Sequence, residues 1–130
     1  MAVQYDQSSP IYLQLAEKIR RRILRHELDP GDKMPSVRDM AVQSNVNPNT
    51  VQRTYSELER MGIVESRRGQ GTFITENEER LEQLRDEMRQ SQIASFVEGM
   101  NEMGFTSKEI LSGLTHYLEQ HEEASTHDTT

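Results

Sequence analysis

The sequence predicts a mainly α-helical fold, and three features of the chain lead to this fold class. Two short helices separated by a tight turn can be read from Pro35 onward, and a glycine-pivoted basic hairpin follows them, up to Ile74. Helical periodicity returns from Glu76. With one more helix before Pro35, this order predicts an N-terminal winged helix-turn-helix (three helices plus a two-stranded β wing), followed by a C-terminal α-helical hairpin for dimerisation.

The composition is that of a polar, cysteine-free chain. Of its 130 residues 33% are hydrophobic, and the mean hydropathy of -0.83 is low for a self-sufficient globule, which favours an extended or oligomeric architecture. The absence of Cys excludes disulfides and thiolate metal sites. No apolar run reaches the roughly 18 residues of a membrane span, and residues 1–10 lack the apolar core of a signal peptide, so we expect a cytoplasmic protein without a membrane partner.

The net charge of -7 is divided unevenly along the chain. Residues 1–75 hold 11 Lys and Arg against 9 Asp and Glu, a net charge of +2, whereas residues 76–130 hold 4 against 13, a net charge of -9. An acidic segment repels a polyanion, so it should point away from any DNA that the first segment contacts. We therefore predict a winged domain at 1–75, a helical dimerisation region at 76–120 and a flexible polar tail at 121–130.

The first helix is predicted to begin at Pro10, with Ser9 as its N-cap. Apolar residues at four-residue spacing define its core face: Ile11, Leu15, Ile19 and Ile23. Arginines gather on the other side, where solvent or DNA phosphates would suit them: Arg20, Arg21, Arg22 and Arg25. The turn sequence at 29–32 predicts the end of this helix.

Capping signals frame the helix-turn-helix. Ser36 is the predicted cap of the second helix, and Asn47 followed by Pro48 predicts the start of the third. A core stripe recurs along the third helix at Val51, Tyr55 and Leu58.

The core stripe leaves a polar outer face on the third helix: Asn49, Thr50, Gln52, Arg53 and Ser56. Asn and Gln can form paired hydrogen bonds with adenine, Arg can bind guanine in the same bidentate way, and the Thr methyl can touch the thymine methyl. An ordinary solvated surface is the alternative. The position of this helix between a short helix and a hairpin favours base recognition.

A basic hairpin tip follows the third helix. Runs of β-prone residues at 63–66 and 72–74 flank it and predict a wing with these tip residues: Arg67, Arg68, Gly69, Gln70 and Gly71. The glycines permit positive φ and close approach of the backbone to DNA, while the arginines supply charge. A merely exposed turn is one alternative. A nucleotide-binding loop is another, and it is disfavoured because no helix begins directly after the tip and no P-loop lysine is present.

Two more helices are predicted after the wing, a long one ending near Gly104 and a last one. The last begins with a capping box, Thr106 with Glu109, and a hydrophobic staple, Phe105 with Ile110. Such a helical pair cannot bury its apolar edge alone, so we expect a second copy of the chain to cover it, with packing onto the winged domain as the alternative. The predicted dimerisation residues are Leu81, Leu84, Met88, Phe96, Val97, Met100, Leu111, Leu114 and Leu118.

Over residues 9–75 the chain resembles the GntR family of bacterial transcription regulators, in particular its small YtrA-type subfamily. Four motifs together carry the resemblance: Pro-Ile-Tyr-Leu-Gln-Leu-Ala at 10–16, Leu-Asp-Pro-Gly-Asp-Lys-Met-Pro-Ser-Val-Arg at 28–38, Asn-Pro-Asn-Thr-Val-Gln-Arg-Thr-Tyr-Ser-Glu-Leu-Glu at 47–59 and Gly-Gln-Gly-Thr-Phe at 69–73. Other branches of the family often have Arg at the positions of Pro48 and Gln52. The departure from Arg in this chain agrees with the YtrA-type pattern.

The resemblance implies a homodimeric repressor that binds double-stranded DNA at a palindromic operator, and control of a transporter operon. By motif position it places DNA contacts at Ser36 and Arg38, on the outer face of the third helix and around the wing tip. Larger members carry a ligand-sensing or aminotransferase-like domain after the wing, and the roughly 55 residues that follow it here are too few for either. A small-molecule effector, if there is one, would find a cleft between the C-terminal helices and the winged domain.

Two other classes of function are weighed against DNA binding. A winged helix can also serve as a protein-interaction module, which would show little salt dependence toward DNA. An enzyme is not expected, because no nucleophile with a companion base is apparent. No metal site or cofactor is expected either, since no two of the four His are four residues apart.

Overall fold

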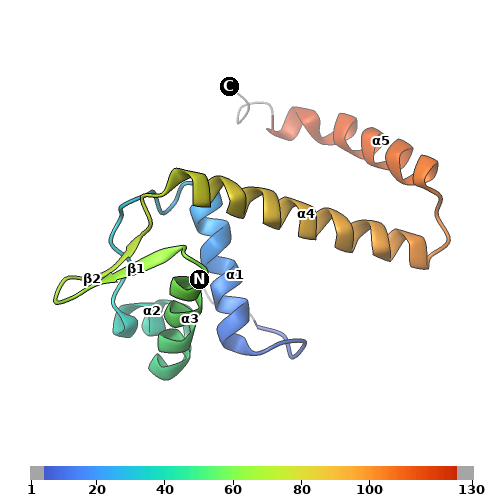
Figure 1. Cartoon of the computed structure of the whole chain (residues 1–130). Coiled ribbons are helices and arrows are strands. Elements are labelled where there is room, and N and C mark those ends of the chain that lie inside the picture. Colours follow the sequence, from blue (N-terminus) through green and yellow to red (C-terminus); the bar gives the residue numbers. More distant parts are fainter. Residues whose placement is uncertain (1–4, 126–130) are drawn as a thin grey trace. The chain divides into compact units, whose positions relative to one another are not determined.

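The computed structural model describes residues 5–125 and confirms the mainly helical fold with a two-stranded wing (Figure 1). The chain divides into two compact units, one up to Arg85 and one from Asp86 onward. The elements in chain order are α1 (Ile11–Leu24), α2 (Val37–Ser44), α3 (Pro48–Arg60), β1 (Val64–Arg67), β2 (Gly71–Ile74), α4 (Glu78–Glu102) and α5 (Ser107–Ser125). None of the described helices is both long and apolar enough to cross a lipid bilayer.

Helix α1 contributes one apolar face to the core of the first unit. Its buried residues are Leu15, Ala16, Ile19 and Ile23, and it packs against α3. The predicted N-terminus is wrong by one residue: Pro10 is the N-cap with an extended ψ of 143° and no side-chain cap, so Ser9 does not cap the helix. The core role of Ile11 is also wrong, because at the first position of the helix its side chain stays 44% exposed. The helix stops at Leu24, earlier than the 29–32 turn, since His26 takes a left-handed φ of 63°.

The helix-turn-helix follows the predicted caps. Ser36 Oγ accepts a hydrogen bond from the Asp39 N–H at 3.1 Å, and Asn47 Oδ1 accepts one from the Asn49 N–H at 2.7 Å. Between the two helices Asn45 turns the chain with a left-handed φ of 55°. Caps of this kind satisfy the N–H groups that the first turn of a helix leaves free.

The core of the helix-turn-helix is also as predicted at Val51, Tyr55 and Leu58, which are all buried. Thr54 is a buried position that the apolar pattern did not predict. The Tyr55 hydroxyl donates to the Pro35 carbonyl oxygen at 2.7 Å, and burial raises the pKa of Tyr55.

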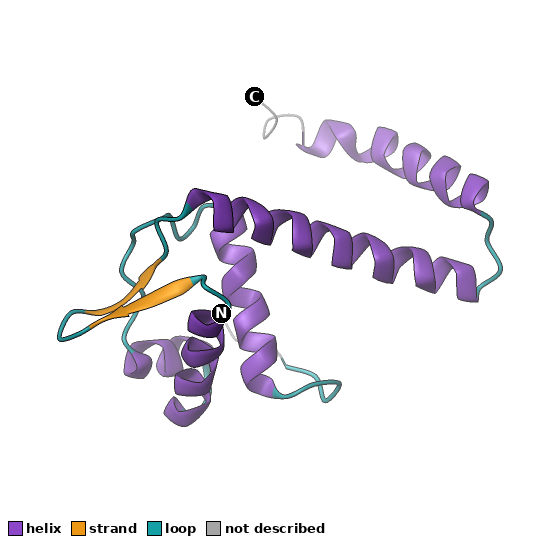
Figure 2. Cartoon of the chain, viewed as in Figure 1, coloured by secondary structure: helices purple, strands orange, loops and turns teal. Residues whose placement is uncertain are grey.

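The wing is an antiparallel hairpin in which Val64 pairs with Ile74 and Arg67 with Gly71 (Figure 2). Ile74 is fully buried and anchors the hairpin in the first unit. The connection between α1 and α2 runs along β2: the Met34 N–H donates to the Thr72 carbonyl at 2.7 Å, and the Ile74 N–H to the Asp32 carbonyl at 2.8 Å. The hairpin is therefore paired on both sides of β2.

The start of helix α4 belongs to the winged unit. Leu84 is 1% exposed, Arg80 Nε donates to the Met61 carbonyl at 2.8 Å, and Arg85 Nη2 donates to the Leu24 carbonyl at 2.7 Å. The boundary lies between 85 and 86, ten residues later than the predicted change at 75/76. Leu84, which the sequence predicts as a dimerisation residue, is already buried within its own chain.

The second unit consists of α4 from Asp86 onward and α5. The chain turns at Gly104, whose φ is 86°, and the capping box forms as predicted: the Thr106 N–H donates to Glu109 Oε1 at 2.9 Å and the Glu109 N–H to Thr106 Oγ1 at 3.2 Å. Helix α5 continues through 121–125, where the sequence predicts a polar tail, and the rest of that tail lies outside the described residues.

Apolar side chains remain exposed along the second unit of the single chain: Ile93, Phe96, Met103, Phe105, Leu111, Leu114, Tyr117 and Leu118. Ile110 is buried, and the other predicted dimerisation residues of this unit, Met88, Val97 and Met100, are half-buried.

Candidate nucleic-acid interface

The outer face of α3 carries the predicted base-reading residues. Asn49, Gln52, Arg53 and Ser56 are exposed, and Thr50 is half-buried. The face is free because α1 and α2 pack against the opposite side of α3, where the core stripe lies. Since Asn47 caps the helix and Pro48 starts it, Asn49 and Thr50 stand in its first turn, the part of a recognition helix that reaches base edges.

Arg53 is oriented by an aromatic residue of α1. Its guanidinium carbon lies 4.0 Å from the centre of the Tyr12 ring, a cation–π contact. The two residues border a shallow hollow of about 280 Å³ along α3, together with Gln52, Ser56, Glu57 and Arg60. No pattern in the sequence pointed to Tyr12 as part of the site.

Acidic and basic groups at the C-terminal end of α3 pair with each other. Arg60 donates to both oxygens of Glu57, at 3.0 and 2.5 Å, and this hydrogen-bonded guanidinium holds the pKa of Glu57 below its usual range. The positive charge of Arg60 balances the negative charge of the Glu57 carboxylate, so this carboxylate repels the phosphates of a DNA backbone less strongly.

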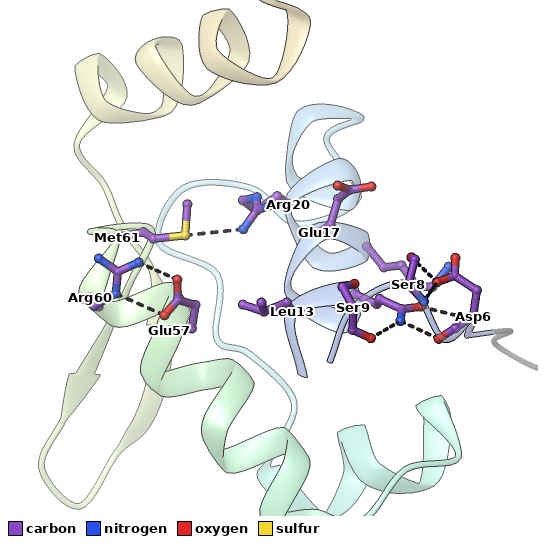
Figure 3. Close-up of a pocket in the computed structure, with 11 residues that line it drawn as sticks. Asp6, Ser8, Ser9, Leu13, Glu17, Arg20, Glu57, Arg60 and Met61 are labelled. Carbon is purple, nitrogen blue, oxygen red and sulfur yellow. Dashed lines mark hydrogen bonds and ion pairs between the residues drawn. The ribbon is translucent and has the colours of Figure 1, made fainter. Parts of the chain in front are cut away.

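The same pair borders a cleft of about 590 Å³ between α3, α1 and the segment before α1. Figure 3 shows Arg60 and Glu57 at one side and Asp6 with Ser8 and Ser9 at the other. The lining includes as many acidic as basic side chains, so the cleft presents no single sign of charge. No group of three or more metal-ligating side chains occurs among the described residues.

The two wing arginines differ in their surroundings. Arg67 is held inside the hairpin: its guanidinium lies 4.1 Å from the Phe73 ring centre, 2.9 Å from Glu65 Oε1 and 3.7 Å from Glu76 Oε2. Arg68 is exposed and makes no hydrogen bond or ion pair with a described residue. The charge that is available at the tip therefore belongs to Arg68.

The two glycines of the wing tip take positive φ, a conformation that the sequence predicts they can adopt. Gly69 and Gly71 have φ values of 74° and 117°, and the Gln70 N–H closes the turn on the Arg67 carbonyl at 2.8 Å. Residues with a Cβ rarely adopt such φ values, so these positions favour glycine.

Lys33 is a candidate DNA contact that the sequence did not reveal. It forms a β-bridge with Phe73, and its side chain crosses Gly71 so closely that a Cβ at Gly71 would lie 2.9 Å from Lys33 Cε. Its ammonium group is thereby placed beside the wing tip, where it adds a second positive charge to that of Arg68. Lys33 reaches the wing tip only because its segment pairs with β2, which is distant in the sequence, and no local motif predicts this position.

The start of α2 contributes one more exposed cation. Arg38 reaches solvent and has no hydrogen-bond or ion-pair partner in the described part of the chain. The Ser36 oxygen accepts the capping hydrogen bond, which leaves its O–H able to donate to a phosphate oxygen.

A helix-turn-helix with an exposed polar second helix and a basic wing defines the class of DNA-binding winged helix proteins. The family of bacterial regulatory proteins called gntR matches residues 11–74. The chain belongs to this GntR family, and it is a transcriptional regulator with a DNA-binding winged helix.

Relatives along and beyond the winged domain support this assignment. The HTH-type transcriptional regulator YhcF of Bacillus subtilis is 54% identical over 116 residues, which is 89% of this chain and 96% of that protein. The HTH-type transcriptional repressor YtrA of the same organism is 50% identical over 70 residues, 54% of each chain, and agrees with the YtrA-type resemblance. These relatives are regulators and not enzymes.

A solved structure confirms the fold. A GntR family transcriptional regulator from Listeria monocytogenes superposes with a TM-score of 0.80 at 35% identity, over 86% of this chain and 98% of that one. The similarity thus extends past the wing into the C-terminal helices.

Proposed function

We propose that the protein is a homodimeric repressor that binds an inverted-repeat operator in the bacterial cytoplasm. The observation that carries this proposal is the polar face of α3 from Asn49 to Arg53, which the same winged unit accompanies with the exposed cations Arg38, Lys33 and Arg68. Base-reading side chains together with phosphate-binding cations are what a major-groove reader needs. The name of YtrA, a repressor, supports repression rather than activation.

The residues divide into two roles. Asn49, Thr50, Gln52 and Arg53 would read base edges in the major groove, because they stand on the exposed face of α3. Phosphate contacts would come from Arg38 at the start of α2 and from the wing, through Lys33, Arg68 and the backbone of 69–71. Arg67 would act mainly by holding the wing in shape.

A second copy of the chain is the proposed partner of the second unit. Leu111, Leu114 and Leu118 recur on one face of α5 and are exposed in the single chain, a pattern that a monomer rarely leaves in water. A symmetric dimer would present two α3 helices to successive major grooves, about 10 base pairs apart, on an operator with matching symmetry.

A transporter operon as the target, and a small-molecule effector, are further parts of this proposal. They rest on the YtrA-type resemblance. Footprinting of the DNA upstream of the protein's own gene and of neighbouring transporter genes tests the target, and a ligand screen on the DNA-bound protein tests the effector.

The central experiment is a binding competition between duplexes. A randomised library with two half-sites in inverted orientation is selected with the full chain, and the selected duplex then competes with a version in which one half-site is scrambled. We expect the intact inverted repeat to win by orders of magnitude. Equal competition by the scrambled duplex would reject the proposal.

Replacing Lys33 or Arg68 with Ala should weaken binding to every duplex. For each phosphate that the variant no longer neutralises, the salt dependence should fall by roughly 0.9 log unit of affinity per log unit of salt. The measurement is a salt titration of binding to the selected and scrambled duplexes. Lys108→Ala on α5 removes the same charge outside the winged unit and serves as the control. A slope unchanged by both wing variants would remove these side chains from the interface.

Replacing Gln52 with Ala should relax selectivity while leaving general affinity nearly intact. One good bidentate base contact is worth about 1 to 3 kcal/mol of discrimination. The variant and the parent protein are compared on duplexes with each base pair of the half-site changed in turn, and preference should collapse at one position only. Ser112→Ala, a polar truncation on α5, is the control. A uniform loss over all positions would instead indicate a phosphate contact.

A further inference from the structure

We propose that Tyr12 of α1 is a positioning residue for Arg53, so that a residue outside the helix-turn-helix takes part in operator selectivity. The inference rests on the proposed function, in which the outer face of α3 meets DNA. It assigns a role to an aromatic ring that contacts a predicted base-reading side chain.

The contact is made from a fixed platform. Thr54, which is completely buried and follows Arg53 in the sequence, donates its hydroxyl to the Tyr12 carbonyl at 3.0 Å, and the same hydroxyl lies 3.0 Å from the Thr50 carbonyl. The backbone of Tyr12 is therefore tied to α3 one residue from Arg53. Main chain and ring of the same residue thus contact successive residues of the recognition helix.

The contact with the Tyr12 ring is the interaction that orients the Arg53 side chain in the described part of the chain. Arg53 makes no hydrogen bond or ion pair with a described residue, and the nearby carboxylate of Glu57 is taken up by two hydrogen bonds from Arg60. Without the ring the long side chain would sample many rotamers, and a DNA contact would have to order it.

The cation–π contact leaves the guanidinium able to bind DNA. Arg53 Cζ lies over the Tyr12 ring, and no hydrogen bond to a described residue occupies the N–H donors of Arg53. The edge that forms paired hydrogen bonds with guanine O6 and N7 therefore remains open. An aromatic ring is suited to holding an Arg in this manner because it does not occupy the hydrogen-bond donors.

The test compares Tyr12→Leu, which removes the ring, with Tyr12→Phe, which keeps the ring face and loses only the hydroxyl. In the full chain without DNA, NMR should show the Arg53 side-chain protons shifted by the ring current in the parent protein and in Tyr12→Phe, and not in Tyr12→Leu. Thermal unfolding of each variant records whether the fold is retained.

The same variants are then bound to the selected inverted-repeat duplex and to its scrambled version. Tyr12→Leu should lower the preference for the selected duplex about two- to fivefold, the range of an exposed cation–π contact, and Tyr12→Phe should keep it. In an Arg53→Ala background Tyr12→Leu should have no further effect on preference, because the residue it orients is gone.

Three outcomes overturn the inference. The ring-current shift could be absent from the parent protein, Tyr12→Phe could lose as much preference as Tyr12→Leu, or Tyr12→Leu could have the same effect with and without Arg53. The proposed function fails separately, when the parent protein itself shows no preference for the inverted repeat. If the parent protein showed the ring-current shift but no preference for the inverted repeat, Tyr12 would contact Arg53 without contributing to operator selectivity.

Discussion

Replacing Leu84 with Ala should lower the free energy of unfolding of the winged unit by about 2 to 5 kcal/mol, the usual cost of truncating a fully buried leucine. Leu84 is 1% exposed and fixes the first turns of α4 to this unit, so the truncation leaves a cavity that the surrounding side chains fill only in part. Urea unfolding at fixed protein concentration, followed by circular dichroism, measures the change.

Val42→Ala is the matched control for this prediction. It truncates an aliphatic side chain that is 78% exposed on α2 of the same unit, so it should leave unfolding of the winged unit unchanged. If Leu84→Ala instead kept the unfolding free energy within about 0.5 kcal/mol and dissociated the protein into monomers, Leu84 would be an intersubunit contact as the sequence had predicted.

Placing charges on the exposed face of α5 should abolish both self-association and tight operator binding. The double variant Leu114→Glu with Leu118→Glu puts two carboxylates into the proposed dimer contact, where they would be desolvated without partners. A monomer holds one half-site only, so the affinity for the inverted repeat should fall by about 10² to 10⁴ because the two half-sites are no longer bound together. Analytical ultracentrifugation and the duplex competition measure the two effects.

The control for this variant carries the same added charge on the same helix. Ser112→Glu with Gln120→Glu introduces two carboxylates at exposed polar positions and should retain both the dimer and operator binding. If the leucine variant remained dimeric, α5 would not be the contact between copies, and the exposed apolar residues of α4 would be the next to test.

Local signals account for the part of the fold that the sequence predicted. The starts of α2, α3 and α5 were readable because each has a capping residue, Ser36, Asn47 and Thr106. The side chain of each accepts a hydrogen bond from a backbone N–H two or three residues later in the sequence. The hairpin of the wing was readable from the glycines and the β-prone runs, although its strands reach one residue further into the predicted tip, to Arg67 and from Gly71. The start of α1 was misread because a proline is tolerated both as the cap and as the first helical residue, and Pro10 takes the former place.

Nonlocal contacts account for what the sequence could not predict. Leu84 on α4 and Leu114 on α5 each belong to an apolar stripe of helical spacing, and such a stripe does not say whether its own chain or another one covers it. Arg67 and Arg68 are adjacent, but Arg67 ends β1 and lies over the Phe73 ring, whereas Arg68 stands in the turn and is exposed. Lys33 joins the site only through its bridge to Phe73.

The pairing of residues 32–34 with β2 also closes one edge of the wing sheet. An open strand edge offers unpaired N–H and C=O groups on which a strand of another molecule can assemble. Here the outer side of β2 is occupied by hydrogen bonds to Asp32 and Met34, so a foreign strand finds no free edge there. This side of the hairpin is thereby closed to the addition of a strand from another molecule.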